Sequence, residues 1–295
     1  MRLKWGDLWH ALSMAWTKLK RSSGAWNSRL APTPSGLLHL GNALNFALTA
    51  VLVRHTGGTL ALRIDDLDSE RSRPGYIEDI FATLRWLGFT WEQGPQTAEE
   101  FQAHYRQELH LARYRRHLDQ IPKYLCDCTR SQVRARTSAH YDGLCRSRQL
   151  SWQEGVTQWR YFAAHPAQDV VLWRKDDLPS YHLASLSDDL ALRVNLIVRG
   201  EDLREASQVQ RLLAHHLGAA GEAFEAATLW HHPLLLDEAG EKLSKSQPKQ
   251  GGAPLRQRFA TPAALFRELA RCAGLPAVES LEEARDTWPS VLLEA

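Results

Sequence analysis

From Arg29 onward, strand-like and helix-like segments alternate along the chain, and this alternation constrains the fold more than any other feature. Prolines and glycines at 29–41 predict an extended segment and a turn, and residues 42–55 then follow helical spacing. A second helical pattern has a natural end at Gly88. Buried strands are predicted at 59–64, 169–173 and 194–198. Because strands and helices alternate, we predict an α/β fold with a parallel sheet.

Residues 123–150 interrupt this alternation, because they are rich in cysteine and arginine and poor in apolar residues. Three of the four cysteines in the chain, Cys126, Cys128 and Cys145, lie within 20 residues of one another. Such spacing favours a metal site in a reducing compartment over disulfide bonds, with three unmetallated thiols as the alternative. From ligand chemistry alone, His140 is the default fourth ligand.

The formal net charge of +2, from 36 basic and 34 acidic side chains, is too balanced to indicate nucleic-acid binding by itself. Residues 1–28 carry five basic side chains and one acid. They are interpreted as a disordered extension, with a helix lying on a membrane or RNA as the alternative. A second basic segment lies at 123–148. We expect it either to contact RNA phosphates or to form a solvated surface. Its basic residues are Lys123, Arg130, Arg134, Arg136, Arg146 and Arg148, against Asp127 and Asp142. No apolar run is long enough to span a membrane, so we expect a cytoplasmic protein without a membrane partner.

Two short motifs have residue types suited to a nucleotide. The first is H-L-G-N at 39–42, at the start of a predicted helix, where free amides and the helix dipole favour a phosphate. His39 could donate a hydrogen bond to that phosphate, and Gly41 leaves room for its approach. The second is K-L-S-K-S at 242–246, whose lysines suit a loop that closes on a polyphosphate. Taken separately, a capped turn and a solvated charge run are the favoured explanations of these motifs.

Together the two motifs resemble the HIGH and KMSKS signatures of class I aminoacyl-tRNA synthetases, and more narrowly the glutamyl/glutaminyl branch. Five segments match that branch in its order and at plausible spacing. They are R-L-A-P-T-P-S-G-L-L-H-L-G-N at 29–42, L-R-I-D-D-L-D at 62–68, L-R-W-L-G-F at 84–89, V-R-G-E-D-L at 198–203 and K-L-S-K-S at 242–246. The resemblance implies a Rossmann-like catalytic domain and a ligase that converts ATP, bound with Mg²⁺, to AMP and pyrophosphate.

The resemblance also implies roles for individual residues. Those that would contact the amino acid are Arg29, Thr33, Asp65, Tyr181 and Arg199. Those that would form the ATP site are His39, Gly41, Asn42 and Lys245, and catalysis would fall to His39, Lys242 and Lys245. Glutamate enzymes usually have Glu where this chain has Asp65, which leaves the choice between glutamate and glutamine open. For Tyr181, a core tyrosine is the alternative.

For the cysteine cluster, the resemblance implies one structural zinc ion per chain, in the pattern C-x-C…Y-x-x-x-C. Cys126, Cys128, Tyr141 and Cys145 match this pattern, so Tyr141 would be the fourth ligand, with the adjacent His140 as its rival. Four protein ligands would leave no open position, which is typical of a structural site.

The chain of 295 residues ends soon after the K-L-S-K-S motif, too early for the anticodon-reading domain of complete glutamyl-tRNA synthetases. It therefore resembles the truncated paralogues called glutamyl-queuosine tRNA(Asp) synthetases. These activate glutamate with ATP and transfer it to queuosine in the anticodon stem-loop of tRNA(Asp). The alternatives are an acceptor-end glutamyl- or glutaminyl-tRNA ligase without its own anticodon domain, and a non-catalytic paralogue that binds RNA or an amino acid. We expect a monomer.

These interpretations divide the chain into five parts. They are the extension at 1–28, the first half of the catalytic domain at 29–122, a zinc-binding, acceptor-like insertion at 123–168, the second half of the catalytic domain at 169–236, and the K-L-S-K-S loop with a small helical stem-contact remnant at 237–295.

Overall fold

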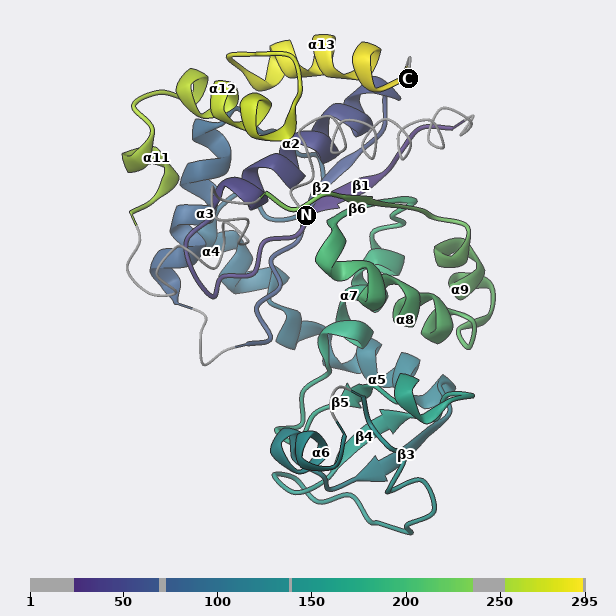
Figure 1. The fold of residues 1–295 in the computed structure, drawn as a ribbon. Helices are drawn as coiled ribbons and strands as arrows, with labels where there is room; N and C mark the ends of the chain where they lie inside the picture. The colour runs from purple at the N-terminus through teal and green to yellow at the C-terminus, as the bar shows by residue number, and fades with distance from the viewer. Residues whose placement is uncertain (1–23, 69–72, 138–139, 236–252, 294–295) are drawn as a thin grey trace. The chain divides into compact units, whose positions relative to one another are not determined.

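The computed structural model describes residues 24–68, 73–137, 140–235 and 253–293 (Figure 1). The chain divides into two compact units. The first contains residues 1–106, 194–204 and 227–295, and the second contains residues 107–193 and 205–226. Most of the predicted N-terminal extension and all of the K-L-S-K-S motif lie outside the described residues. Among the helices that are described, none has both the length and the apolar character needed to cross a membrane.

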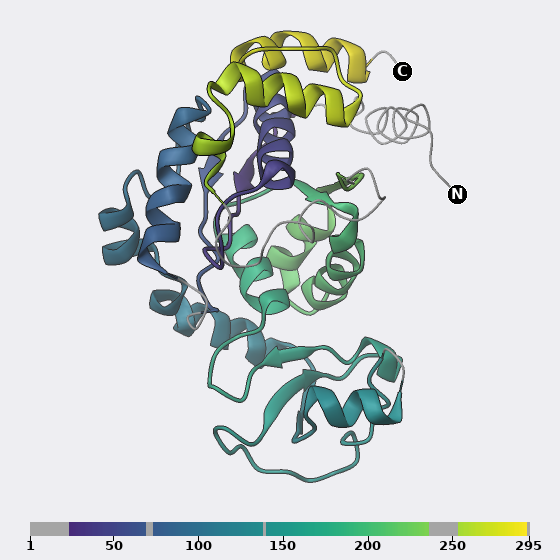
Figure 2. The ribbon, with the colours of Figure 1, turned by 60° about the vertical axis from the view of Figure 1, so that its left-hand side comes forward.

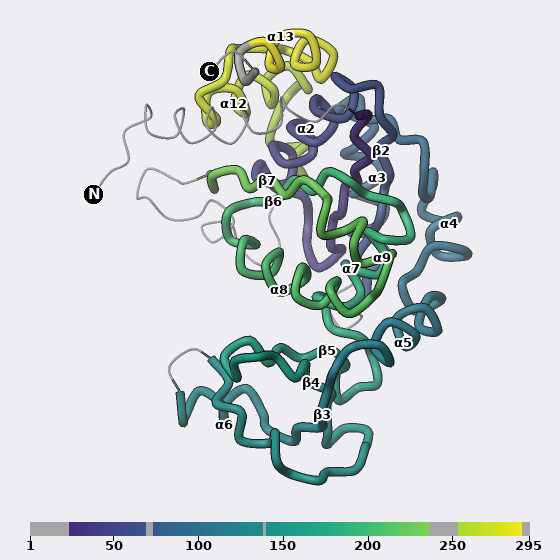
Figure 3. The backbone as a smooth tube through the Cα atoms, turned by 90° about the vertical axis from the view of Figure 1, so that its right-hand side faces the viewer, coloured from purple at the N-terminus to yellow at the C-terminus, as the bar shows by residue number. Residues whose placement is uncertain are grey.

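The first unit is built on two pairs of parallel strands. β1 (Ser28–Leu30) pairs with β2 (Leu60–Leu62), and β6 (Leu196–Gly200) pairs with β7 (Thr228–His232), as Figure 3 shows for the second pair. The Leu196 amide donates to the Asn27 carbonyl at 3.1 Å, so β1 and β6 lie side by side and start at the same level. The strands predicted at 59–64 and 194–198 are therefore present in parallel pairs, and the carboxyl ends of these pairs meet at one edge.

Helices α2 (Leu40–His55) and α3 (Pro74–Trp86) belong to this unit. α2 begins two residues before the predicted helix and packs on β1 and β6. α3 ends where the sequence predicts, because Gly88 has a φ of +79°, a left-handed conformation that favours glycine. Shorter elements complete the region, namely α4 (Ala98–Glu100), the π-helix η1 (Phe101–Tyr105) and the 3₁₀ helix η4 (Glu201–Leu203).

The C-terminal helices complete the core of the first unit. They are α11 (Leu255–Arg258), α12 (Pro262–Ala273) and α13 (Leu281–Leu293). α12 and α13 contact α2, as the yellow-green to yellow ribbons beside the purple helix in Figure 2 show. Trp288 is fully buried, and its indole Nε1 donates to the Pro276 carbonyl at 3.0 Å. The described residues of the part predicted as a small helical remnant, at 237–295, are thus mainly helical.

The second unit contains an antiparallel sheet of β3 (Lys123–Cys126), β4 (Gln158–Tyr161) and β5 (Val171–Trp173), in that order. The strand predicted at 169–173 exists as β5, but it pairs antiparallel with β4 instead of joining a parallel sheet. The physical reason is the short connection after β4, which returns the chain beside the strand it has just left, whereas a parallel pair needs a longer crossover.

Along the chain, helices precede, separate and follow the strands of this sheet. They are η2 (Gln107–His110), α5 (Leu111–Gln120), α6 (Arg130–Arg136), η3 (Pro166–Gln168), α7 (Tyr181–Ala191), α8 (Arg204–Ala214) and α9 (Gly218–Glu225). α5 and α7 are joined through the buried Asp188 carboxylate, which accepts hydrogen bonds from Gln107 at 2.8 Å and Tyr114 at 2.9 Å and also pairs with Arg113. A buried charge held by this many donors fixes the two helices together.

Candidate active site and metal centre

The H-L-G-N motif lies at the start of α2, as predicted, and forms a reciprocal cap. His39 Nδ1 accepts a hydrogen bond from the Asn42 amide at 3.3 Å, and Asn42 Oδ1 accepts one from the His39 amide at 3.1 Å. Because Nδ1 is the acceptor, the neutral imidazole carries its proton on Nε2. The motif therefore combines a side-chain N–H donor with a helix N-terminus, where an anion is favoured.

Gly41 has a local reason to be glycine. A Cβ at this position would lie 3.0 Å from His39 Cε1 and 3.1 Å from His39 Nδ1. A larger residue would therefore press on the imidazole that caps the helix. The space beside Gly41 is therefore occupied by the His39 side chain. The role predicted for Gly41 toward a nucleotide stays a prediction.

Three of the predicted amino-acid contacts lie in neighbouring strands or just beyond them, and all three are buried. Arg29 in β1 and Arg199 in β6 are each 3% exposed. Asp65 follows β2, and its amide donates to the Pro32 carbonyl at 2.9 Å, which continues the pairing with the segment after β1. Burying charges is costly. Their concentration toward the carboxyl ends of a parallel sheet is typical of a ligand site.

Arg63 is a partner of the candidate site residue Asp65 that sequence reasoning missed. Its Nε lies 2.6 Å from Asp65 Oδ1 and its terminal NH2 lies 3.1 Å from Asp65 Oδ2, so the guanidinium holds the carboxylate with two hydrogen bonds. The signal was available, because residues two apart in an extended segment share a face. The next residue, Asp66, pairs with Arg106 at 3.3 Å.

The other residues predicted to contact the substrates differ in burial and in their place in the chain. Thr33 is exposed in the segment after β1. Tyr181 is the first residue of α7 in the second unit, and it is 40% exposed, which rules out the alternative of a core tyrosine. Lys242 and Lys245 lie outside the described residues.

β7 contributes two histidines that the sequence did not single out. His231 lies opposite Arg199 in the β6–β7 register. Burial, with the charges of Arg204 and Arg199, lowers the pKa of His231 to about 4, so this imidazole is neutral at neutral pH. The next residue, His232, is buried, and its Nε2 lies 3.1 Å from the Asn45 side-chain amide of α2. A neutral imidazole thus stands beside the strand that carries a buried arginine.

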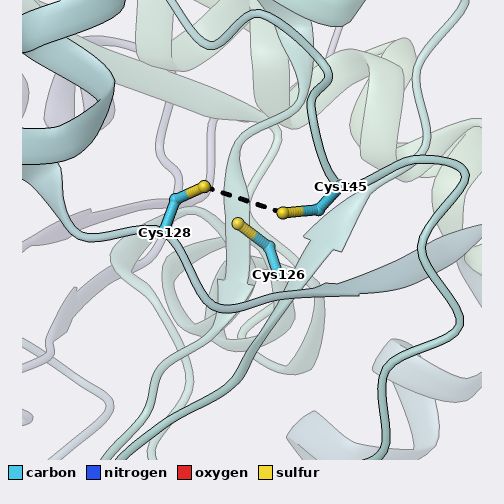
Figure 4. A group of neighbouring side chains, drawn as sticks. All are labelled: Cys126, Cys128 and Cys145. Atoms are coloured by element: carbon cyan, nitrogen blue, oxygen red, sulfur yellow. Dashed lines mark hydrogen bonds between the residues drawn. The ribbon is translucent and has the colours of Figure 1, made fainter.

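The cysteine cluster of the second unit brings its members together as predicted. The sulfurs of Cys126, Cys128 and Cys145 all lie within 4.8 Å of one another and all three residues are buried (Figure 4). The Tyr141 hydroxyl lies 3.5 Å from Cys126 Sγ, and Tyr141 is buried. His140 is exposed. Three buried thiols with a phenol at contact distance fit the tetrahedral, thiolate-rich coordination of a structural zinc ion.

The basic segment around this cluster is more fully paired than its sequence suggests. Four of its six basic residues form ion pairs with carboxylates, and two of these carboxylates lie outside the segment. The pairs are Lys123–Asp119 at 3.8 Å, Arg136–Asp142 at 2.6 Å, Arg146–Asp169 at 2.7 Å and Arg148–Asp127 at 2.7 Å. Arg130 and Arg134 are exposed on α6. The positive charge available at the surface is therefore smaller than the residue count indicates.

Comparison with known proteins assigns the family. The family described as tRNA synthetases class I (E and Q), catalytic domain, matches residues 26–155. The Glutamyl-Q tRNA(Asp) synthetase of Synechococcus sp. (strain CC9605) is 38% identical over 266 residues, which cover 88% of this chain and 87% of that protein. This chain belongs to the glutamyl-Q tRNA(Asp) synthetase family. As a member of this class I family it is a ligase of the aminoacyl-tRNA synthetase type, and ATP binding follows from the family.

This chain is also similar to longer enzymes. The Glutamate--tRNA ligase of Thermosynechococcus vestitus is 33% identical over 258 residues, which cover 74% of this chain and 51% of that enzyme. The crystal structure of a glutamate-tRNA synthetase from Elizabethkingia anophelis superposes with a TM-score of 0.69 at 25% identity, and the match covers 89% of this chain and 65% of that one. The predicted class I α/β fold, with a cysteine cluster and a helical C-terminal part, is confirmed.

Proposed function

We propose that this ligase activates glutamate with ATP and transfers it to queuosine in the anticodon of tRNA(Asp). The observation that carries the proposal is the match to a Glutamyl-Q tRNA(Asp) synthetase over 88% of this chain and 87% of that protein. By contrast, the match to a Glutamate--tRNA ligase covers only 51% of that enzyme.

The amino-acid site is proposed to use the buried charges at the carboxyl edge of the parallel strands. Arg29 and Arg199 would hold carboxylates of glutamate, because a planar guanidinium can bind a carboxylate through two hydrogen bonds. Asp65, oriented by its two bonds from Arg63, would accept the α-ammonium group. Thr33 would line the remainder of the pocket in this unit, and the contact of Tyr181 with the amino acid stays a prediction from the sequence.

The first chemical step is proposed to be attack by the α-carboxylate of glutamate on the α-phosphorus of ATP. A bond forms between the carboxylate oxygen and this phosphorus, the bond to the bridging oxygen breaks, and pyrophosphate leaves with its electron pair. His39 Nε2–H and the Gly41 amide would stabilise the negative charge on the phosphate, together with Lys242 and Lys245, while Asn42 would hold His39 in position. Mg²⁺ bound with ATP would supply further charge neutralisation.

The second step would be acyl transfer. A hydroxyl of queuosine attacks the acyl carbon of glutamyl-adenylate, AMP leaves with the electrons of the broken bond, and the hydroxyl proton passes to solvent or to the departing phosphate. We propose that the insertion at 123–168 contacts the anticodon stem-loop, and that Cys126, Cys128, Tyr141 and Cys145 keep it folded around one zinc ion. The exposed arginines of α6 support an RNA contact, since guanidinium groups bind phosphates. The protein would act as a monomer.

Two assays test the proposal in sequence. ATP–pyrophosphate exchange with glutamate, glutamine or aspartate tests activation, and we expect exchange with glutamate in the absence of tRNA. Transfer of labelled glutamate is then compared between tRNA(Asp) with queuosine, tRNA(Asp) without it, and tRNA(Glu). We expect label only on the first. No exchange with any of the three amino acids would leave a non-catalytic paralogue, and label on tRNA(Glu) alone would indicate an acceptor-end ligase.

A further inference from the structure

Each sulfur of the cysteine cluster has a nitrogen donor from outside the cluster. Two of the three donors are guanidinium groups. The pairs are Arg136 with Cys128 at 3.5 Å, Arg148 with Cys145 at 3.5 Å, and the Gln158 side-chain amide with Cys126 at 3.9 Å. Hydrogen bonds to sulfur stabilise the thiolate, which is the form of cysteine that binds a metal.

The same two arginines also hold aspartates that adjoin the candidate ligands. Asp127 lies inside the C-D-C segment and is bound by Arg148 through two hydrogen bonds of 2.7 and 2.9 Å. Asp142 follows Tyr141 and is bound by Arg136 through two hydrogen bonds of 2.6 and 3.1 Å. Each guanidinium therefore bridges a carboxylate and a sulfur, so its position is fixed on both sides.

A third guanidinium faces the phenol. Arg160 on β4 lies over the Tyr141 ring, 4.0 Å from its centroid, and is 9% exposed. Its NH1 donates to the Asp169 carbonyl at 2.7 Å, which holds the side chain in place. A buried cation over the face of a phenol is favourable, and more so when the phenol has anionic character.

These contacts answer a charge problem that the candidate ligands create. Three thiolates already outnumber the positive charges of a divalent ion, and a phenolate adds another negative charge. Excess charge in a buried site is costly unless it is compensated. We propose that Arg160 is a counter-charge of the metal centre, and that Arg136 and Arg148, whose own charges are paired with Asp142 and Asp127, retain the metal by donating hydrogen bonds to its sulfur ligands. This inference rests on the proposed zinc site.

Two groups of arginines in this basic segment would therefore have different roles. Arg136 and Arg148 are exposed too, but an aspartate and a sulfur hold each of their guanidinium groups, and we assign them to the metal. Arg130 and Arg134, exposed on α6, are the arginines that we assign to RNA phosphates. Removing an arginine of the first group should change metal retention. Removing one of the second group should weaken tRNA binding and reduce its salt dependence, because fewer counterions are released.

The test uses the full chain and compares Arg136→Gln and Arg148→Gln with Arg134→Gln. The last is a matched control, because Arg134 and Arg136 lie on the same helix. Zinc release to a chromogenic chelator is followed after zinc content has been measured, and far-ultraviolet circular dichroism monitors folding. We expect release roughly 10–100-fold faster in the first two variants, the usual size of effects from residues that orient metal ligands, and unchanged release in the control.

A double variant separates contact with sulfur from pairing with aspartate. Asp127→Asn with Arg148→Gln removes both members of the ion pair, and we expect zinc release to stay fast because Cys145 still lacks its donor. Release at the wild-type rate in this variant, or in both single variants, would overturn the inference. Should Arg148→Gln fail to fold, Arg148→Lys keeps the charge without the planar fork and should give an intermediate rate; a wild-type rate there counts against the sulfur contact.

The outcome can be told apart from that of the proposed ligase activity. Wild-type protein that binds no zinc would defeat this inference together with the metal centre. ATP–pyrophosphate exchange, measured on the same preparation, would then still decide whether the protein activates glutamate.

Discussion

His39 and Asn42 hold each other across the first turn of α2. The imidazole Nδ1 accepts the Asn42 amide at 3.3 Å, and the Asn42 side-chain oxygen accepts the His39 amide at 3.1 Å. This exchange uses one ring nitrogen for capping and leaves the Nε2–H as a donor. One pair of residues thus serves both the stability of the helix and the proposed binding of phosphate, and two substitutions can separate these contributions.

We expect His39→Asn to reduce the rate of ATP–pyrophosphate exchange by about 10²–10³-fold, the usual cost of removing one donor to a developing oxyanion. Asparagine is a good N-cap, so the free energy of unfolding should change by less than about 0.5 kcal/mol. Asn42→Ala should instead lower the free energy of unfolding by about 1 kcal/mol. Urea denaturation and exchange assays on both variants check this, and full exchange activity in His39→Asn would exclude the proposed phosphate donor.

The Arg63–Asp65 pair is buried on both sides, with side chains 7% and 10% exposed. Arg63→Met should lower the free energy of unfolding by about 3–5 kcal/mol, because it leaves the Asp65 carboxylate buried without this partner. The control is Arg73→Met, since Arg73 is exposed at the N-cap of α3 and makes no capping hydrogen bond from its side chain. Chemical denaturation of both variants is the measurement, and equal losses would show that the pair contributes nothing special.

The lowered pKa of His231 predicts a dependence of stability on pH. Its pKa falls from 6.5 to about 4 through burial and the charges of Arg204 and Arg199. As the pH drops below 6.5, the unfolded chain therefore binds a proton that the folded chain does not, and the folded state loses stability until the pH reaches about 4. His231→Gln should reduce this slope, whereas substitution of the exposed His140 by Gln should not. Urea midpoints measured across this range check the prediction, and an unchanged slope in His231→Gln would contradict it.

The sequence predicted features that depend on neighbouring residues in the chain. The helix at 42–55, the end of α3 before Gly88 and the cysteine cluster follow from periodicity, glycine chemistry and close spacing. The sequence did not predict contacts between residues that lie far apart in the chain. Arg199 meets His231 only through the β6–β7 register, and Arg146 finds its carboxylate at Asp169. Such contacts depend on which strands become neighbours, and that information is spread over the whole chain.

Substitution of Trp288 tests whether the C-terminal helices stabilise the hydrophobic core. Trp288 is fully buried in α13, which contacts α2. Trp288→Ala should lower the free energy of unfolding by about 3–5 kcal/mol, as expected for loss of a large buried aromatic side chain. Trp152→Ala is the control, because Trp152 is 37% exposed, and it should cost about 1 kcal/mol or less. If Trp288→Ala left stability unchanged and weakened only tRNA binding, the predicted stem-contact role would account for these helices better than a role in the core.

Tyr141 and His140 offer a direct comparison of two candidate fourth ligands. The Tyr141 hydroxyl lies 3.5 Å from Cys126 Sγ and also accepts the Cys145 amide at 2.9 Å, whereas the adjacent His140 is exposed. Tyr141→Phe keeps the ring beneath Arg160 and removes only the oxygen, so it should weaken zinc binding by at least about 10–100-fold, the loss seen when even an outer-shell partner is removed. His140→Ala should leave zinc affinity unchanged. Competition with a chelator of known affinity measures both, and a loss confined to His140→Ala would make the histidine the ligand, because the phenol would then be a bystander held by the Cys145 amide.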